Sequence, residues 1–171
     1  SGGTESDNWA IFGTAKRFGK KNRHIITTAM EHHAVLNCMK ELESQGFEVT
    51  YLQPDGLGNI SVDALKEALR KDTILVSIMY VNNEIGSVQP IAEAVRIVKN
   101  YNPRILFHTD AVQAFCKIPL SPKRLGLDLI SVSGHKVHAP KGVGALVIDP
   151  KIKKNKGLAP IIFGDNLSGA V

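Results

Sequence analysis

A continuous apolar run of strand length, TILVSIM at residues 73–79, constrains the fold most strongly. A strand without a polar face must be buried on both sides, which is typical of a parallel sheet covered by helices. Further strand-type runs lie at residues 24–28, 48–52, 105–108, 127–132 and 145–148. Because segments with helical spacing separate most of these runs, we predict an α/β fold: a mostly parallel sheet with helices on both faces.

The first predicted helix follows a Gly-Gly pair and ends near Gly19, and three residues at its start are candidate N-caps: Thr4, Ser6 and Asp7. Further helices are expected to begin near Glu31, Ser61 and Pro90. A helix start preceded by small residues lets backbone N–H groups approach an anion such as phosphate. An ordinary capped helix would show the same pattern.

The chain of 171 residues is 43% hydrophobic and 22% charged, which is typical of a globular domain. It has no apolar run long enough to cross a bilayer and no visible signal peptide. The net charge of +5 is concentrated at residues 16–23 and 151–156, but few aromatic residues accompany it, so we expect a solvated surface and no direct nucleic-acid contact. Cys38 and Cys116 are expected to be free core thiols in a reducing compartment.

Polar residues follow four of the predicted strands: His32, Asn82 with Asn83, Asp110 with Gln113, and Ser133 with His135 and Lys136. The carboxyl ends of parallel strands meet at one edge of the sheet, so we expect these clusters to converge there. A lysine that is desolvated at this edge can attack a carbonyl group. The alternative for Lys136 is a side chain that extends into water.

The segments SGGTESDN, EHHAVL, VNNEIG, HTDAVQ and SGHKVHAPKGVGAL together resemble the cysteine desulfurases. These are pyridoxal phosphate enzymes of aminotransferase class V and fold type I, and the resemblance is closest to bacterial desulfurases of iron–sulfur assembly. It covers residues 1 to about 164 in the family's order. It implies that residues 1–164 are a large cofactor-binding domain, incomplete at the N-terminus. Residues 165–171 would be a divergent tail, and the C-terminal small domain would be absent.

The resemblance also implies roles for individual residues. Lys136 would bind pyridoxal 5'-phosphate covalently and move the Cα proton, and His32 would stack on the ring and assist proton transfer. Asp110 would pair with the pyridine nitrogen. Gln113 and Asn83 would lie near the ring's 3-oxygen, and the phosphate would be held by Gly3, Thr4, Ser133 and His135. We expect His33 on a helix surface, His108 as a strand residue with a satisfied ring, and His138 in the loop after Lys136. The histidines lack companions for a metal site.

By the same resemblance, the whole enzyme would convert L-cysteine to L-alanine and leave a persulfide on its own cysteine. The sulfur would pass to an acceptor or scaffold protein for iron–sulfur clusters or thiolated tRNA. The full enzyme is expected to be a cytoplasmic homodimer without a membrane segment. Since neither cysteine matches the family's catalytic position, we expect this chain alone to be inactive. The alternatives are another class V enzyme, such as a selenocysteine lyase or aminotransferase, and a catalytically dead interaction module.

Overall fold

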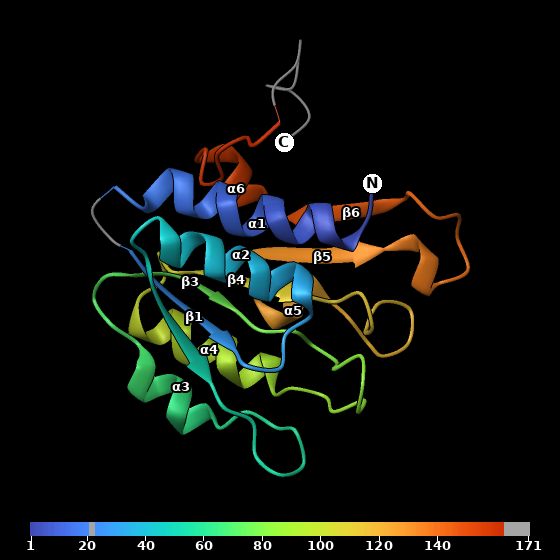
Figure 1. Ribbon diagram of the computed structural model, residues 1–171, viewed down its shortest axis with the longest axis horizontal. Coiled ribbons are helices and arrows are strands. Elements are labelled where there is room, and N and C mark those ends of the chain that lie inside the picture. The colour runs from blue at the N-terminus through green and yellow to red at the C-terminus, as the bar shows by residue number, and fades with distance from the viewer. Residues whose placement is uncertain (21–22, 163–171) are drawn as a thin grey trace.

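The computed structural model describes residues 1–20 and 23–162, and a six-stranded sheet forms the centre of this part of the chain (Figure 1). The strands are β1 (His24–Thr28), β2 (Glu48–Leu52), β3 (Thr73–Ser77), β4 (Leu106–Asp110), β5 (Leu129–Ser133) and β6 (Gly144–Ile148). Their order is β2-β1-β3-β4-β5-β6, and only β6 is antiparallel to its neighbour. The predicted, mostly parallel sheet is therefore confirmed. The predicted tail, residues 165–171, lies outside the described residues.

Helices cover both faces of this sheet. They are α1 (Gly3–Phe18), α2 (His33–Ser44), α3 (Val62–Ala68), α4 (Ile91–Tyr101), α5 (Pro122–Leu125) and α6 (Pro150–Lys154), with a single 3₁₀ turn, η1 (Gly134–Lys136). α1 and α2 lie on one face, and α3 and α4 lie on the other (Figure 1). This arrangement leaves the carboxyl ends of the parallel strands uncovered by helices.

The two faces of the sheet build two separate cores. Leu106 on β4 packs with residues of α1 and α2, whereas the next residue, Phe107, packs with α4 on the opposite face. Both side chains are almost completely buried. Burying a side chain of this size contributes about 1.5–3 kcal/mol each. The central strands are therefore apolar on both sides, as the run at residues 73–79 predicts.

The start of α1 differs from the prediction of side-chain capping. Gly2 is the N-cap, and no side chain makes a capping bond there. Ser6 and Asp7 lie inside the helix and are buried, so neither is a cap. Asp7 is buried on the same side of α1 as Ala10 and Ile11, three and four residues further on.

The two cysteines behave differently. Cys38 is buried on α2, as expected, and its Sγ donates to the Ala34 carbonyl. The prediction that Cys116 is a core residue is wrong, because its side chain is exposed in the turn after Asp110, at a positive φ of 59°. Neither thiol forms a disulfide in the part of the chain that the structure describes.

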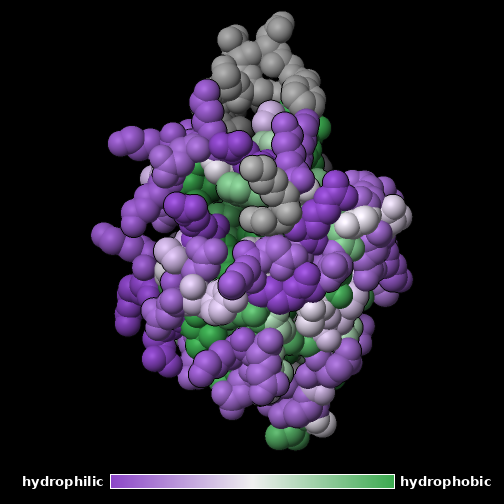
Figure 2. All heavy atoms as spheres, turned by 90° about the vertical axis from the view of Figure 1, so that its left-hand side faces the viewer, coloured by the Kyte–Doolittle hydropathy of each residue, from purple (hydrophilic) through white to green (hydrophobic). Residues whose placement is uncertain are grey.

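The described lysines and arginines of the two basic clusters are exposed, as predicted. Figure 2 shows the end of the sheet where the parallel strands begin, and hydrophilic side chains cover most of this face. Among the described residues, no helix has the length and apolar character required to cross a membrane.

Candidate active site

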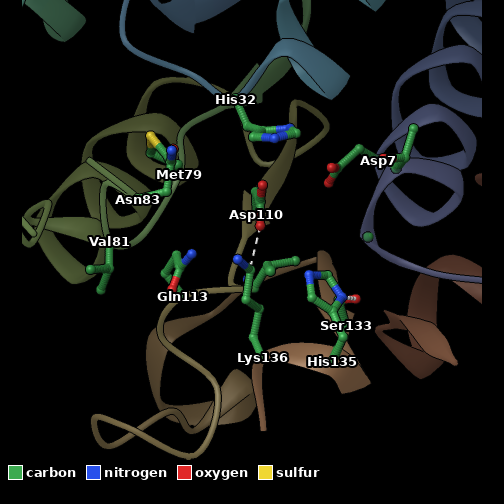
Figure 3. Close-up of a pocket in the computed structure, with 13 residues that line it drawn as sticks. Asp7, His32, Met79, Val81, Asn83, Asp110, Gln113, Ser133, His135 and Lys136 are labelled. Carbon is green, nitrogen blue, oxygen red and sulfur yellow. Dashed lines mark hydrogen bonds between the residues drawn. The ribbon is translucent and has the colours of Figure 1, made fainter. Parts of the chain in front are cut away.

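All four polar clusters predicted at the strand ends meet in one cavity of about 240 Å³ (Figure 3). This volume lies just below the roughly 300–1,000 Å³ usual for small-molecule sites. The start of α1 and the carboxyl ends of three neighbouring strands supply most of its walls. The lining residues are Gly3, Thr4, Asp7, His32, Met79, Val81, Asn83, Asp110, Val112, Gln113, Ser133, His135 and Lys136. Every residue to which the resemblance gives a cofactor role is among them. Asn82 is not: it is buried, and its side-chain amide donates to the Met30 carbonyl.

Lys136 reaches the cavity from η1, which begins directly after β5. The turn is compact because Gly134 packs tightly: a Cβ there would lie 3.0 Å from the Ala139 Cβ and 3.1 Å from the Val143 carbonyl oxygen. The expectation of a desolvated lysine is not met, since Lys136 is exposed to solvent. Its side chain lines the cavity together with Asp110 (Figure 3).

Asp110 is the last residue of β4 and is only 7% exposed. Its Oδ1 accepts a hydrogen bond of 2.8 Å from the backbone N–H of Val112, which fixes the carboxyl at the strand end. Burial raises the pKa of Asp110, while the Val112 N–H and the neighbouring His32 act in the opposite direction. A buried carboxyl of this kind is suited to pair with a cationic group brought into the cavity.

His32 and Gln113 flank Asp110 (Figure 3). His32 is the N-cap of α2, and its Nδ1 accepts from the Ala34 N–H at 3.1 Å, so the ring orientation is fixed by the helix start. The Oε1 of Gln113 accepts from Lys117 at 2.7 Å, which leaves the Gln113 amide nitrogen free to donate into the cavity. Asn83, in the loop after β3, completes this wall and is exposed.

The opposite wall has the character of an anion site. Gly3 and Thr4 are the first two residues of α1, whose leading N–H groups have no partner within the helix. Ser133 and His135 lie beside them on the cavity wall. A Cβ on Gly3 would lie 2.8 Å from Cγ2 of Val112, so only glycine allows this close approach.

Asp7, which the sequence interpretation treated as a cap, lies in the cavity wall with its side chain 2% exposed. Its Oδ1 lies 3.6 Å from Nε2 of His108 and has no hydrogen-bond partner among the described residues. Burial raises the pKa of Asp7 to about 9, with Asp110 and Glu31 adding to the effect and a bond from Ser131 opposing it. The helical spacing of Asp7 to Ala10 and Ile11 is consistent with the buried side of α1, but an aspartate at this position suits a helix cap equally well.

His108 lies on β4 under the cavity and is completely buried. Its Nδ1 is 2.9 Å from the hydroxyl of Ser77 on β3, and its Nε2 is 3.0 Å from the hydroxyl of Ser131 on β5. Burial lowers the pKa of His108 to about 3, so the ring is neutral at ordinary pH. The prediction that this histidine is a strand residue with a satisfied ring is confirmed.

Glu31 precedes His32 and is also buried. Its Oε1 accepts from the Thr28 hydroxyl at 2.9 Å and from the Met79 N–H at 2.8 Å, which joins the ends of β1 and β3. Burial raises the pKa of Glu31 to about 8, although these two bonds act against the shift. The carboxyl therefore holds together the two strand ends beside His32.

Comparison with known proteins places these features in a family. The model described as aminotransferase class-V matches residues 1–167. The cysteine desulfurase IscS of Methanosarcina thermophila is 53% identical over 164 residues, which are 96% of this chain and 39% of that protein. A solved structure of a NifS-like protein superposes with a TM-score of 0.92 at 43% identity, covering 98% of this chain and 45% of the other. A structure titled SspA in complex with cysteine superposes with a TM-score of 0.91 at 43% identity. The match covers 98% of this chain and 47% of that chain.

The chain belongs to the class V aminotransferase family, and its fold is that of the NifS-like cysteine desulfurases. Both groups are pyridoxal phosphate enzymes. The chain spans about two fifths of the curated relative's length.

The chemistry of the cavity lining fits pyridoxal phosphate. The residues that would hold the cofactor are a helix start with free backbone N–H groups, the buried carboxyl of Asp110 and the amine of Lys136.

Proposed function

We propose that this chain is the cofactor-binding part of a cysteine desulfurase, which converts L-cysteine to L-alanine and transfers the sulfur to a cysteine of the same enzyme. The observation that carries the proposal is that Asp110 and Lys136 line the same cavity. Asp110 is the last residue of β4, and Lys136 lies in the turn after the adjacent strand β5. When bound, pyridoxal phosphate supplies an electron sink for the bonds at the substrate's Cα. The cofactor-binding and proton-transfer roles that follow belong to residues of this chain.

Asp110 would hold a proton on the pyridine nitrogen through a charged hydrogen bond, supported by its burial and by the Val112 N–H that orients it. Gln113 would donate to the ring's 3-oxygen from the amide nitrogen that Lys117 leaves free. Asn83 would lie near the same oxygen, and His32 would lie against the ring face.

The phosphate would be bound by Gly3 and Thr4 at the start of α1, with Ser133 and His135 as further donors. Lys136 would attach the cofactor and would then move a proton to and from the substrate's Cα, since its side chain lines the cavity. His32 would assist this proton transfer.

The sulfur-accepting cysteine is not proposed among the residues of this chain. Cys38 is buried under α2, and burial raises the pKa of its thiol to about 12, which suppresses the reactive thiolate. Cys116 is exposed, but it does not line the cavity. We therefore propose that the persulfide forms elsewhere in the whole protein.

The wider roles are also part of the proposal. The full enzyme would act as a cytoplasmic homodimer and pass sulfur to an acceptor or scaffold protein of iron–sulfur cluster assembly. The free state of both cysteines agrees with a reducing compartment. The names of the similar proteins support the desulfurase reaction.

The test is covalent trapping of the cofactor in the full-length protein. After incubation with pyridoxal phosphate and reduction with borohydride, we expect the added mass on the peptide that contains Lys136. The Lys136→Ala variant should lose it, whereas Lys141→Ala, which removes an exposed lysine of the following loop, should retain it. No adduct in the wild type would contradict the proposal and favour an interaction module. Alanine formation from L-cysteine, compared with that from L-selenocysteine, separates a desulfurase from a selenocysteine lyase.

A further inference from the structure

Three carboxyl groups are buried around the cavity with little positive charge to balance them. Asp7, Glu31 and Asp110 are 1%, 5% and 7% exposed. None of them forms an ion pair with a lysine or arginine of the described residues, and the cavity's lysine, Lys136, is exposed to solvent. Carboxylates so close together in a low-dielectric region cannot all ionise. At least one of them must hold a proton at neutral pH.

The surroundings of Asp7 favour its protonated form. The titratable groups that face it are Asp110 and His108 from β4, Glu31 from the segment after β1, and Cys38 from α2. His108 is neutral, so none of these groups supplies a positive charge to Asp7. The raised pKa of Asp7, about 9, agrees with this arrangement.

Asp110 is better placed to carry a negative charge. The Val112 N–H donates to its Oδ1, and His32 lies close enough to favour its ionised form. Asp7, in contrast, leaves Oδ1 without a partner. A protonated Asp7 gains a hydroxyl donor that a carboxylate lacks, and both Nε2 of His108 and the hydroxyl of Ser131 are acceptors within its reach.

We propose that Asp7 is a neutral positioning residue: its protonated carboxyl braces β4 from α1 through the hydrogen-bond chain of Ser131 and His108, and leaves Asp110 as the charged carboxyl of the cavity. His108 precedes Asp110 by two residues, so both side chains point to the face of β4 that α1 covers. The protonation state of Asp7 follows from the chain alone. Its effect on the cofactor rests on the proposed function.

The first experiment measures the protonation state directly in the full-length protein without cofactor. The infrared difference between the wild type and Asp7→Asn near neutral pH should contain the C=O band of a protonated carboxyl. This band should be replaced by carboxylate bands as the pH rises past about 9. The matched control is Asp55→Asn, because backbone N–H groups lower the pKa of this exposed aspartate. Its difference spectrum should contain carboxylate bands only.

A carboxylate signal from Asp7 near neutral pH would overturn the inference. If Asp7→Asn does not fold, ¹³C-aspartate-labelled wild type gives the same answer. One carboxyl resonance should titrate in the alkaline range and persist in Asp110→Asn, which removes the other buried aspartate of the cavity. The absence of such a resonance would equally overturn it.

The second experiment tests the consequence for the bound cofactor. Ionisation of Asp7 at alkaline pH adds a negative charge beside Asp110, so the absorption spectrum of the cofactor should change in that range. The part of this change that Asp7 causes should be absent from Asp7→Asn, because asparagine stays neutral throughout that range. A protein that binds no cofactor but gives the protonated-carboxyl band contradicts the proposed function only. An alkaline transition with the same midpoint and amplitude in the wild type and in Asp7→Asn contradicts this inference.

Discussion

The Oγ of Ser133 lies 2.7 Å from Nδ1 of His135, so the last residue of β5 is hydrogen bonded to the residue that precedes Lys136. This contact fixes the 3₁₀ turn at the strand end, on the wall of the cavity next to the start of α1 (Figure 3). With a neutral imidazole, one of the two side chains can then donate towards an anion bound at that helix start. The donor is the Ser133 hydroxyl when Nδ1–H of His135 donates to it, and Nε2–H of His135 when the hydroxyl donates to Nδ1.

The first prediction concerns this hydroxyl. Ser133→Ala should lower the affinity of the full-length protein for pyridoxal phosphate by about 10-fold, since one hydrogen bond contributes about 1 kcal/mol and its loss also frees the His135 ring. The absorption maximum of the bound cofactor should stay unchanged, because the ring contacts remain. Fluorescence titration measures both. The control is Ser121→Ala, which removes a hydroxyl without a capping bond at the start of α5, and an equal loss in that variant would contradict the prediction.

Asp110→Asn should keep the bond from the Val112 N–H but remove the negative charge. Breaking a buried ion pair from one side costs about 3–5 kcal/mol, so desulfurase kcat should fall by about 10²-fold or more in the full-length protein. Steady-state alanine formation measures the loss. Activity within a few-fold of the wild type would show that Asp110 does not act on the ring nitrogen.

Gly3→Ala should distort the beginning of α1, because its Cβ would lie 2.8 Å from Cγ2 of Val112. Overpacking of this kind costs about 1–3 kcal/mol in the free energy of unfolding, and cofactor affinity should fall with it. Urea denaturation and cofactor titration measure the two effects. Gly56→Ala is the matched control, since no atom lies within 4 Å of its Cβ position. Equal effects in the two variants would refute the steric explanation.

The raised pKa of Glu31 predicts that the free energy of unfolding depends on pH. Its pKa is raised from 4.5 to about 8 in the folded chain, so between these values the folded state holds a proton that the unfolded state has released. The contribution of Glu31 to the free energy of unfolding is therefore full below about pH 4.5 and is lost as the pH rises towards 8.

Glu31→Gln removes this titration and keeps an oxygen acceptor for Thr28 and Met79. Urea denaturation at several pH values should give a flatter pH dependence for the variant than for the wild type between pH 4.5 and 8. Parallel curves for the two proteins would show that the carboxyl is ionised in the folded chain.

The 171-residue chain alone should not release sulfur from L-cysteine. Cys38 is buried and Cys116 lies outside the cavity lining, so the chain offers no thiol at the candidate site. Alanine formation by the purified chain, with contaminating desulfurases excluded by the Lys136→Ala control, would contradict this prediction.

Much of the fold could be predicted because its strands are short apolar runs between turn residues. The bounds of β1 and β2 match the predicted residues 24–28 and 48–52. The direction of β6 could not be predicted, because an apolar run of four residues carries no information on strand direction. Its antiparallel pairing with β5 follows from the short connection through η1, which leaves no room for a crossover helix.

The site residues at strand ends could be predicted for a related reason, since the end of each buried strand identifies the residue that reaches the sheet edge. Asp7 could not be assigned with the same rule. An aspartate near a helix start is equally suited to a cap, and only the packing of α1 against β4 and β5 decides that its carboxyl is buried. The exposure of Cys116 likewise depends on a turn with positive φ, which cysteine rarely adopts.

His108 contacts hydroxyl groups on the strands at both sides of its own, through the two nitrogens of one rigid ring. The lateral spacing of β3, β4 and β5 is thus fixed a few ångströms below the tips that lead to Asn83, Asp110 and Lys136. Displacing the end of one strand relative to its neighbours would require breaking a hydrogen bond to the imidazole of His108, which is completely buried. The reacting groups therefore hold their separations before any small molecule enters, and entry need not be accompanied by rearrangement of the sheet.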